Sequence, residues 1–110
     1  MSVTEPNKID GMGVDENGTL VFLIADALTW DQFENTHIEM ILKKLNQYIY
    51  FIQTGGYKSH YPNKTFENFR IELKFKYAYT AAAYHFLETV AEKLQTLNIQ
   101  FVYKVAEDKK

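Results

Sequence analysis

The sequence contains no cysteine, which excludes disulfides, thiolate metal sites and cysteine nucleophiles. It has only two prolines and five glycines, a composition that argues against a disordered or collagen-like chain. Its longest apolar run, Leu20 to Ala25, is far too short to span a bilayer. The N-terminal segment also lacks the basic and apolar blocks of a signal peptide. We therefore expect a cytoplasmic protein without a membrane segment.

An excess of one charge sign is lacking too, because 12 basic and 14 acidic side chains leave a net charge of −2. This balance gives no broad basic field for nucleic acid or anionic lipid. The length of 110 residues is typical of one domain, and we expect residues 1–110 to form one, with residues 1–8 and 107–110 as flexible tails. Aromatic residues are abundant, at 15% of the sequence. A small core holds only some of these rings, so others are expected at surfaces or interfaces.

The first half of the sequence predicts a β-hairpin. Two largely apolar segments, Ile9 to Asp15 and Thr19 to Ala27, flank the pair Asn17-Gly18. Asn-Gly accepts the positive φ angles of a type I′ turn, and with these two residues in the turn Val14 faces Val21. The second strand is apolar on both faces, so it requires cover on both sides.

A long helix should follow the hairpin. Thr29 to Gln32 has the pattern of a capping box with Thr29 as N-cap, and the helix is expected to run to Thr54 and end at Gly55-Gly56. One apolar stripe at helical spacing comprises Ile38, Ile41, Leu42, Leu45, Tyr48, Ile49 and Ile52. A second line on the helix comprises Phe33, His37, Met40, Lys44 and Phe51. A helix that only covers a sheet does not need this second line.

The second half predicts a loop at 57–65 and a strand within 66–79, where apolar and charged residues alternate. Thr80 is expected to cap a second helix that runs to about Asn98, and Ile99 to Ala106 reads as a last strand. The order is β-β-α-β-α-β. Right-handed crossovers place both helices on one face of a four-stranded sheet, which gives a two-layer α+β domain.

Several segments of the sequence carry a resemblance to a known family. They are Gly13-Val14-Asp15-Glu16-Asn17-Gly18, Asp26-Ala27-Leu28-Thr29-Trp30-Asp31, His37, Lys44-Leu45-Asn46, Tyr48, Phe51-Ile52 and Gly55. Together they resemble a family of small, functionally uncharacterised bacterial proteins known only as a domain of unknown function. Such proteins tend to carry a histidine where this chain has Ala27, so a role for that histidine does not transfer. The resemblance implies a bacterial, cytosolic protein and no particular activity.

Motifs for metal and cofactor binding are not found. The three histidines are far apart and none forms the short-spaced pair of a zinc site. Gly11-Met12-Gly13 lies within a predicted strand and lacks the third glycine of a dinucleotide fingerprint. We therefore expect no catalytic, metal-binding or cofactor-binding residues of a recognisable kind.

The turn between the second strand and the first helix carries the best candidates for a small enzyme or ligand binder. Asp26 and Asp31 bracket this turn, and either is a candidate partner for His37 in acid–base chemistry. A histidine at a helix edge is more commonly a hydrogen-bonded structural group, and Asp31 suits the first turn of a helix. The candidate site comprises Asp26, Trp30, Asp31, His37 and the loop residues Tyr57, His60 and Tyr61.

The surplus of apolar surface favours a different function. Phe33, Met40 and Phe51 lie off the main helical stripe, and exposed patches of this kind usually mark interfaces. The leading hypothesis is a non-enzymatic protein-interaction domain, in the form of a homodimer, with these residues or the second strand at the contact. A further alternative is weak nucleic-acid binding through a basic sheet face that carries Arg70 and Lys74.

Overall fold

The computed structural model describes residues 8–31 and 33–106. Its elements follow in the order β1 (Gly11–Val14), β2 (Leu20–Asp26), α1 (Glu34–Gln53), the short 3₁₀ helix η1 (Gly56–Ser59), β3 (Phe69–Phe75), α2 (Ala81–Thr96) and β4 (Ile99–Val105). This is the predicted β-β-α-β-α-β order of an α+β fold. The expected tails at 1–8 and 107–110 lie outside the described residues, except for Lys8.

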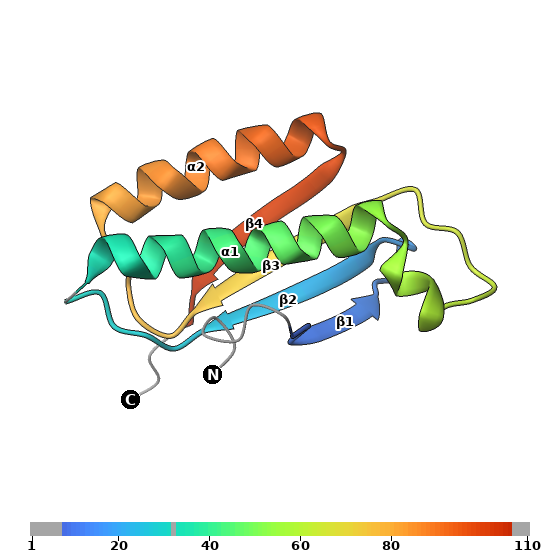
Figure 1. The fold of residues 1–110 in the computed structure, drawn as a ribbon, viewed down its shortest axis with the longest axis horizontal. Helices are drawn as coiled ribbons and strands as arrows, with labels where there is room; N and C mark the ends of the chain where they lie inside the picture. The colour runs from blue at the N-terminus through green and yellow to red at the C-terminus, as the bar shows by residue number, and fades with distance from the viewer. Residues whose placement is uncertain (1–7, 32, 107–110) are drawn as a thin grey trace.

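A four-stranded sheet forms one layer and the two helices form the other (Figure 1). The strand order is β1-β2-β3-β4; β1 pairs antiparallel with β2, and β2, β3 and β4 are mutually parallel. Each parallel pair is joined by one helix, and both helices lie on the same face of the sheet (Figure 1). The carboxyl ends of β2, β3 and β4 therefore meet at one edge of the layer.

The core lies between the sheet and the helices (Figure 1). Leu20, Phe22 and Ile24 of β2 are fully buried, whereas the intervening residues of this strand are only partly buried. The helices contribute the apolar residues Ile41, Leu45, Tyr48, Ile52, Ala83, Leu87 and Leu94. Among residues 8–31 and 33–106 the other face of the sheet has no covering layer, so the predicted cover on both faces of the second strand is not seen there (Figure 1).

The hairpin turn differs from the predicted one. Val14 pairs with Leu20 instead of Val21, so the predicted register is wrong by one residue. The backbone N–H of Asp15 donates to the carbonyl of Thr19, which leaves a three-residue loop in which Gly18 has a φ of 82°. Such a loop is a type I turn followed by one left-handed glycine, in place of a two-residue type I′ turn. As a result, Gly13 pairs with Val21 on the uncovered face.

The first helix begins later than the capping box predicts. It starts at Glu34, and its N-cap is Phe33 in a left-handed conformation with no side-chain cap. The Thr29 hydroxyl donates to Asp31 at 2.7 Å instead of capping a helix, and Gln32 lies outside the described residues. The predicted end of the helix is confirmed, because α1 ends at Gln53 and Gly55 follows with a φ of 75°.

The second helix begins and ends where its terminal residues indicate. The side chain of Thr80 accepts a hydrogen bond from the Ala83 backbone N–H at 3.1 Å, so Thr80 is the predicted N-cap of α2. Asn98, with a φ of 64°, turns the chain directly into β4. In the described part of the chain, neither helix combines the length and the apolarity that a membrane span requires.

Candidate functional site at the start of helix α1

Asp26 is the last residue of β2 and is almost completely buried. The backbone N–H of Leu28 donates to its Oδ1 at 3.0 Å, which holds the carboxylate as the chain turns out of the sheet. In sheets with parallel strands, ligands commonly bind beyond the carboxyl ends of the strands. Asp26 is therefore a buried acid at the edge where functional groups most often lie.

His37 is the partner of this acid. Its Nε2 lies 2.6 Å from Oδ2 of Asp26, and only 3% of the histidine is exposed. A carboxylate only accepts hydrogen bonds, so Nε2 donates to Asp26 and Nδ1 is the other ring nitrogen. Nδ1 is buried and has no hydrogen-bond partner among the described residues. The pair thus holds the imidazole in one orientation and leaves one nitrogen available.

Trp30 covers the imidazole. Its ring stacks on His37 with the centroids 3.7 Å apart and an angle of 18° between the planes. It also contacts Phe75 of β3, with centroids 5.9 Å apart, so it joins the pair to the core. The indole Nε1 of Trp30 is buried without a partner in the described part of the chain. Burying such a group without a hydrogen bond costs about 1–3 kcal/mol, so two orphaned nitrogens in one cluster are unusual for a purely structural element.

A cavity of about 310 Å³ opens beside His37. Its lining consists of Leu28, Thr29, Asp31, Phe33, Thr36, His37 and Met40. This volume lies at the lower end of the range for small-ligand pockets, or fits one large side chain of another protein. Six of the ten sequence candidates lie at this place: Asp31, Phe33, His37 and Met40 line the cavity, Trp30 stacks against His37, and Asp26 bonds to it.

Phe33 is the most exposed of the large apolar residues in the described part of the chain, with 77% of its surface accessible. Its backbone is left-handed (φ 56°, ψ 44°), a conformation that costs a bulky residue on the order of 1–3 kcal/mol. The ring regains little of this cost within the fold because it packs on so little. Met40, seven residues later on the same side of α1, is half-buried in the cavity wall.

Two acids at the start of α1 have local partners. Asp31 accepts a hydrogen bond from the Thr29 hydroxyl, and Glu34 accepts one from the Thr80 hydroxyl. Glu34 is half-buried and links the start of α1 to the start of α2. Of these two acids, only Asp31 lines the cavity.

The remaining sequence candidates lie at the other end of α1. Tyr57, His60 and Tyr61 belong to η1 and the residues after it, about 24 Å along the helix from His37. The centroid of the Phe51 ring lies 6.5 Å from that of the His60 ring and 5.9 Å from that of the core residue Phe22. Tyr57 is buried, whereas His60 is exposed. The fold does not bring these four residues to the Asp26–His37 pair.

A second buried polar cluster is absent from the sequence-based predictions. Lys44 is fully buried, and its Nζ donates to Asp10 Oδ1 at 3.0 Å and to the Lys8 carbonyl at 2.6 Å. Tyr48 Oη accepts from the Asp10 backbone N–H and donates to the Leu23 carbonyl, and burial raises the pKa of this phenol. The sequence indicated this cluster only in that Lys44 lies, with His37, on the second line of residues along the helix. This cluster fastens residues 8–10 to β2 and α1.

The uncovered face of the sheet carries the basic row considered for nucleic acid. Arg70 donates to Asp15 at 3.1 Å and to Glu72 at 2.9 Å, and its pKa is raised mainly by the hydrogen bond to Glu72. Its charge is therefore compensated locally, and Lys74 and Lys104, which are register partners on β3 and β4, are further cations of this row. Across residues 8–31 and 33–106, no three side chains of His, Asp or Glu are grouped to hold a metal ion.

Comparison with known families gives a match over almost the whole chain. The model of a family of unknown function, DUF6572, matches residues 1–107. The chain belongs to this family. Neither a curated protein nor a solved structure gives a significant match. The predicted membership in a family of unknown function is thus confirmed, and the chemistry of the site is the basis for any statement about activity.

Proposed function

We propose that this protein is a non-enzymatic interaction domain that forms a homodimer through the start of α1. The observation that carries the proposal is the exposed, left-handed Phe33 beside an unfilled cavity. Strained residues persist where the surrounding structure or a function requires them, and inside this fold the ring contacts too little to explain its conformation.

A second copy of the chain is the occupant that best suits this surface. A two-fold dimer uses the same patch on both subunits, so the patch must contain both a projection and a hollow. Phe33 supplies the projection, and the cavity lined by Met40 and Leu28 supplies the hollow directly beside it. Aromatic rings in well-packed pockets are the usual centres of binding energy at interfaces.

The polar groups at this surface are compatible with such a contact. Asp31 and Thr29 bond to each other at the mouth of the cavity, where a wet rim can surround an apolar centre. His37 lines the same cavity, and its Nδ1 is buried without a hydrogen-bond partner among the described residues. The Asp26–His37 pair and the stacked Trp30 act here as the rigid base of the pocket.

Light scattering coupled to size-exclusion chromatography tests the proposal. The wild-type chain is expected to have a dimer mass at micromolar concentration, and Phe33→Asn is expected to be a monomer. Asn tolerates the left-handed backbone and is a favoured N-cap, so this variant should keep its stability. Tyr50→Gln is the matched control, because Tyr50 is also an exposed aromatic of α1, at 67%, but does not line the cavity. A monomeric wild type, or a Phe33→Asn dimer, would overturn the proposal.

The second candidate function, a ligand-binding protein or small enzyme, has one observation in its favour. The free Nδ1 of an imidazole held by a buried carboxylate resembles the acid–base pair of many active sites. Thr29 and Thr36 are the hydroxyl groups that line the same cavity. A fragment screen observed through the His37 ring resonances tests this reading. Fragments that shift these resonances in the monomeric Phe33→Asn variant would favour it, and an unresponsive ring would count against it.

A further inference from the structure

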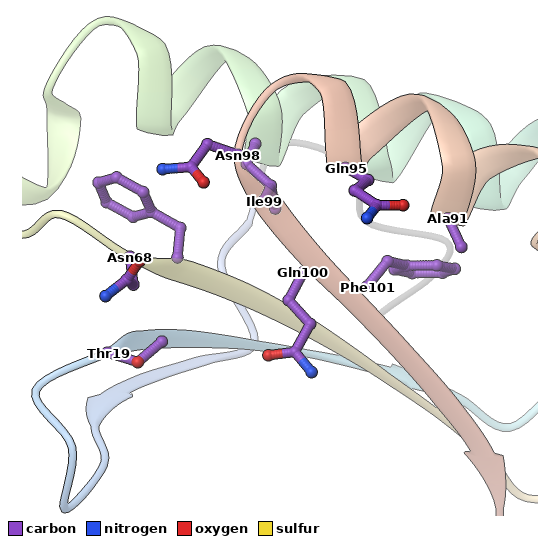
Figure 2. A pocket seen from close by; sticks show the side chains of 9 residues that line it. Thr19, Asn68, Ala91, Gln95, Asn98, Ile99, Gln100 and Phe101 are labelled. Atoms are coloured by element: carbon purple, nitrogen blue, oxygen red, sulfur yellow. The ribbon is translucent and has the colours of Figure 1, made fainter.

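A separate cleft of about 430 Å³ lies at the amino ends of the parallel strands, whereas Asp26 lies at their carboxyl ends. It is lined where β2, β3 and β4 begin and where α2 ends, and Figure 2 shows its side chains. Four of these side chains are carboxamides: Asn68, Gln95, Asn98 and Gln100. Thr19 adds a hydroxyl, and none of the described residues that line the cleft carries a charge.

The carboxamides come from different segments that the fold holds together. Asn98 donates from Nδ2 to the Glu67 carbonyl at 3.1 Å, which fastens the α2–β4 turn to the chain that leads into β3. The Leu20 backbone N–H donates to the Asn68 carbonyl at 3.1 Å, and the Asn98 N–H donates to the Gln95 carbonyl at 3.1 Å. Main-chain or side-chain hydrogen bonds thus fix three of the four residues. The side-chain amides of Asn68, Gln95 and Gln100 have no hydrogen-bond partner in residues 8–31 and 33–106.

The chemistry of this lining selects among ligands. A carboxamide offers two donors and an acceptor with two lone pairs, so it matches a group that both donates and accepts. A ligand with a full charge would find no opposite charge in the lining, and its desolvation would be uncompensated. The apolar lining residues Phe69 and Ala91 are half-buried, and such residues suit a ring with a C–H face, whereas Ile99 and Phe101 are almost completely buried. Neighbouring hydroxyls on a saturated ring satisfy both conditions.

We propose that this cleft binds a neutral, polyhydroxylated ring, that is, an uncharged sugar, free or at the end of an oligosaccharide. The site is independent of the dimer contact at the start of α1. It lies beside the edge strand β4, from which Gln100 projects (Figure 2).

The test is a titration of the ¹⁵N-labelled full chain, followed by amide chemical shifts. The probes are glucose, galactose and N-acetylglucosamine, with maltose as the oligosaccharide arm, gluconate and glucosamine as charged analogues, and a neutral capped peptide. We expect saturable shifts at residues 95–101 and at the side-chain amides of the cleft with at least one neutral sugar. Tighter binding of maltose than of glucose would identify an oligosaccharide end, and equal binding would identify a free sugar.

Variants separate a specific site from a general effect. Gln95→Ala and Gln100→Thr each remove one carboxamide and suit a helix and a strand, and each is expected to weaken sugar binding about tenfold. Gln47→Ala, an exposed carboxamide on α1, should leave the affinity unchanged. The proposal is overturned if no neutral sugar shifts the cleft, if a charged analogue or the peptide binds more tightly, or if both cleft variants bind like the wild type.

Discussion

Removal of His37 should strongly destabilise the fold, because it leaves the buried carboxylate of Asp26 without its side-chain hydrogen-bond donor. The side chain of Asp26 is fully buried, and apart from His37 it accepts the single hydrogen bond of Leu28 described above. Breaking a buried pair in this way costs about 3–5 kcal/mol. For a domain of this size, each kcal/mol lowers Tm by about 4 °C, so His37→Leu should lose about 12–20 °C. Asp26→Leu should cost less, about 1–3 kcal/mol, because it leaves two N–H donors, those of Leu28 and His37, without their acceptor but leaves no buried carboxylate.

A double-mutant cycle makes this reasoning measurable. The variants His37→Leu, Asp26→Leu and their combination are compared by urea denaturation, followed by circular dichroism. The losses in free energy of unfolding of the two single variants should add up to more than the loss of the double variant, and the difference, the coupling energy, should be about 2 kcal/mol. His85→Leu, which replaces the exposed histidine of α2, should stay within about 0.5 kcal/mol of wild type. Small and additive costs for both single variants would refute the buried pair.

Three further perturbations test other parts of the fold. Gly56→Ala should lower the stability by about 1–3 kcal/mol in thermal melts, because an added Cβ would lie 2.6 Å from the Phe51 ring. Gly13→Ala is the matched control: its Cβ would meet no atom within 4 Å, and the stability should rise by about 0.4–1 kcal/mol. Equal effects of the two variants would contradict the packing. Tyr48→Phe leaves two backbone groups unpaired and should cost about 1–3 kcal/mol in urea denaturation, and a neutral result would show that its hydroxyl is not buried in a network. The pKa of Asp15 is lowered from 3.8, chiefly by the hydrogen bond from the Thr19 backbone N–H, so its stabilisation is present above pH 3.8 and is lost as pH falls through the lowered pKa. The difference in Tm between wild type and Asp15→Asn should therefore shrink on acidification below pH 3.8, and a constant difference would contradict the shift.

The layers of the fold follow from local patterns in the sequence. Alternation in the strands identified which residues face the helices, and a single threonine, Thr80, identified the start of α2. The hairpin register did not follow from Asn17-Gly18 alone. The carboxylate of Asp15 accepts from the backbone N–H of Asn17 and of Thr19, and these bonds stabilise a loop one residue longer than the type I′ turn. A side chain outside the two-residue motif therefore decided the register.

The start of α1 was mispredicted for a related reason. Thr29 and Gln32 have the spacing of a capping box, but the Thr29 hydroxyl bonds to Asp31, and Phe33 takes the N-cap position. No propensity favours a left-handed phenylalanine, so a sequence pattern cannot anticipate one. The departure from local preference occurs at the proposed contact surface, where such conflicts are expected.

The Asp26–His37 pairing was among the predicted options because both residues flank one strand-to-helix turn. The Lys44–Asp10 pair was not, since its members lie 34 residues apart and only the packing of residues 8–10 against α1 brings them together. The carboxamide cleft is equally invisible in the sequence, because its amides come from segments that meet only after the sheet has formed.

Isotope-filtered NOE spectroscopy on a dimer mixed from labelled and unlabelled chains tests the central claim most directly. The proposed contact predicts NOEs between the Phe33 ring protons of one copy and the Met40 methyl group of the other, and their loss in Phe33→Asn. A chain at the same concentration whose Phe33 shows NOEs only within its own copy would contradict it.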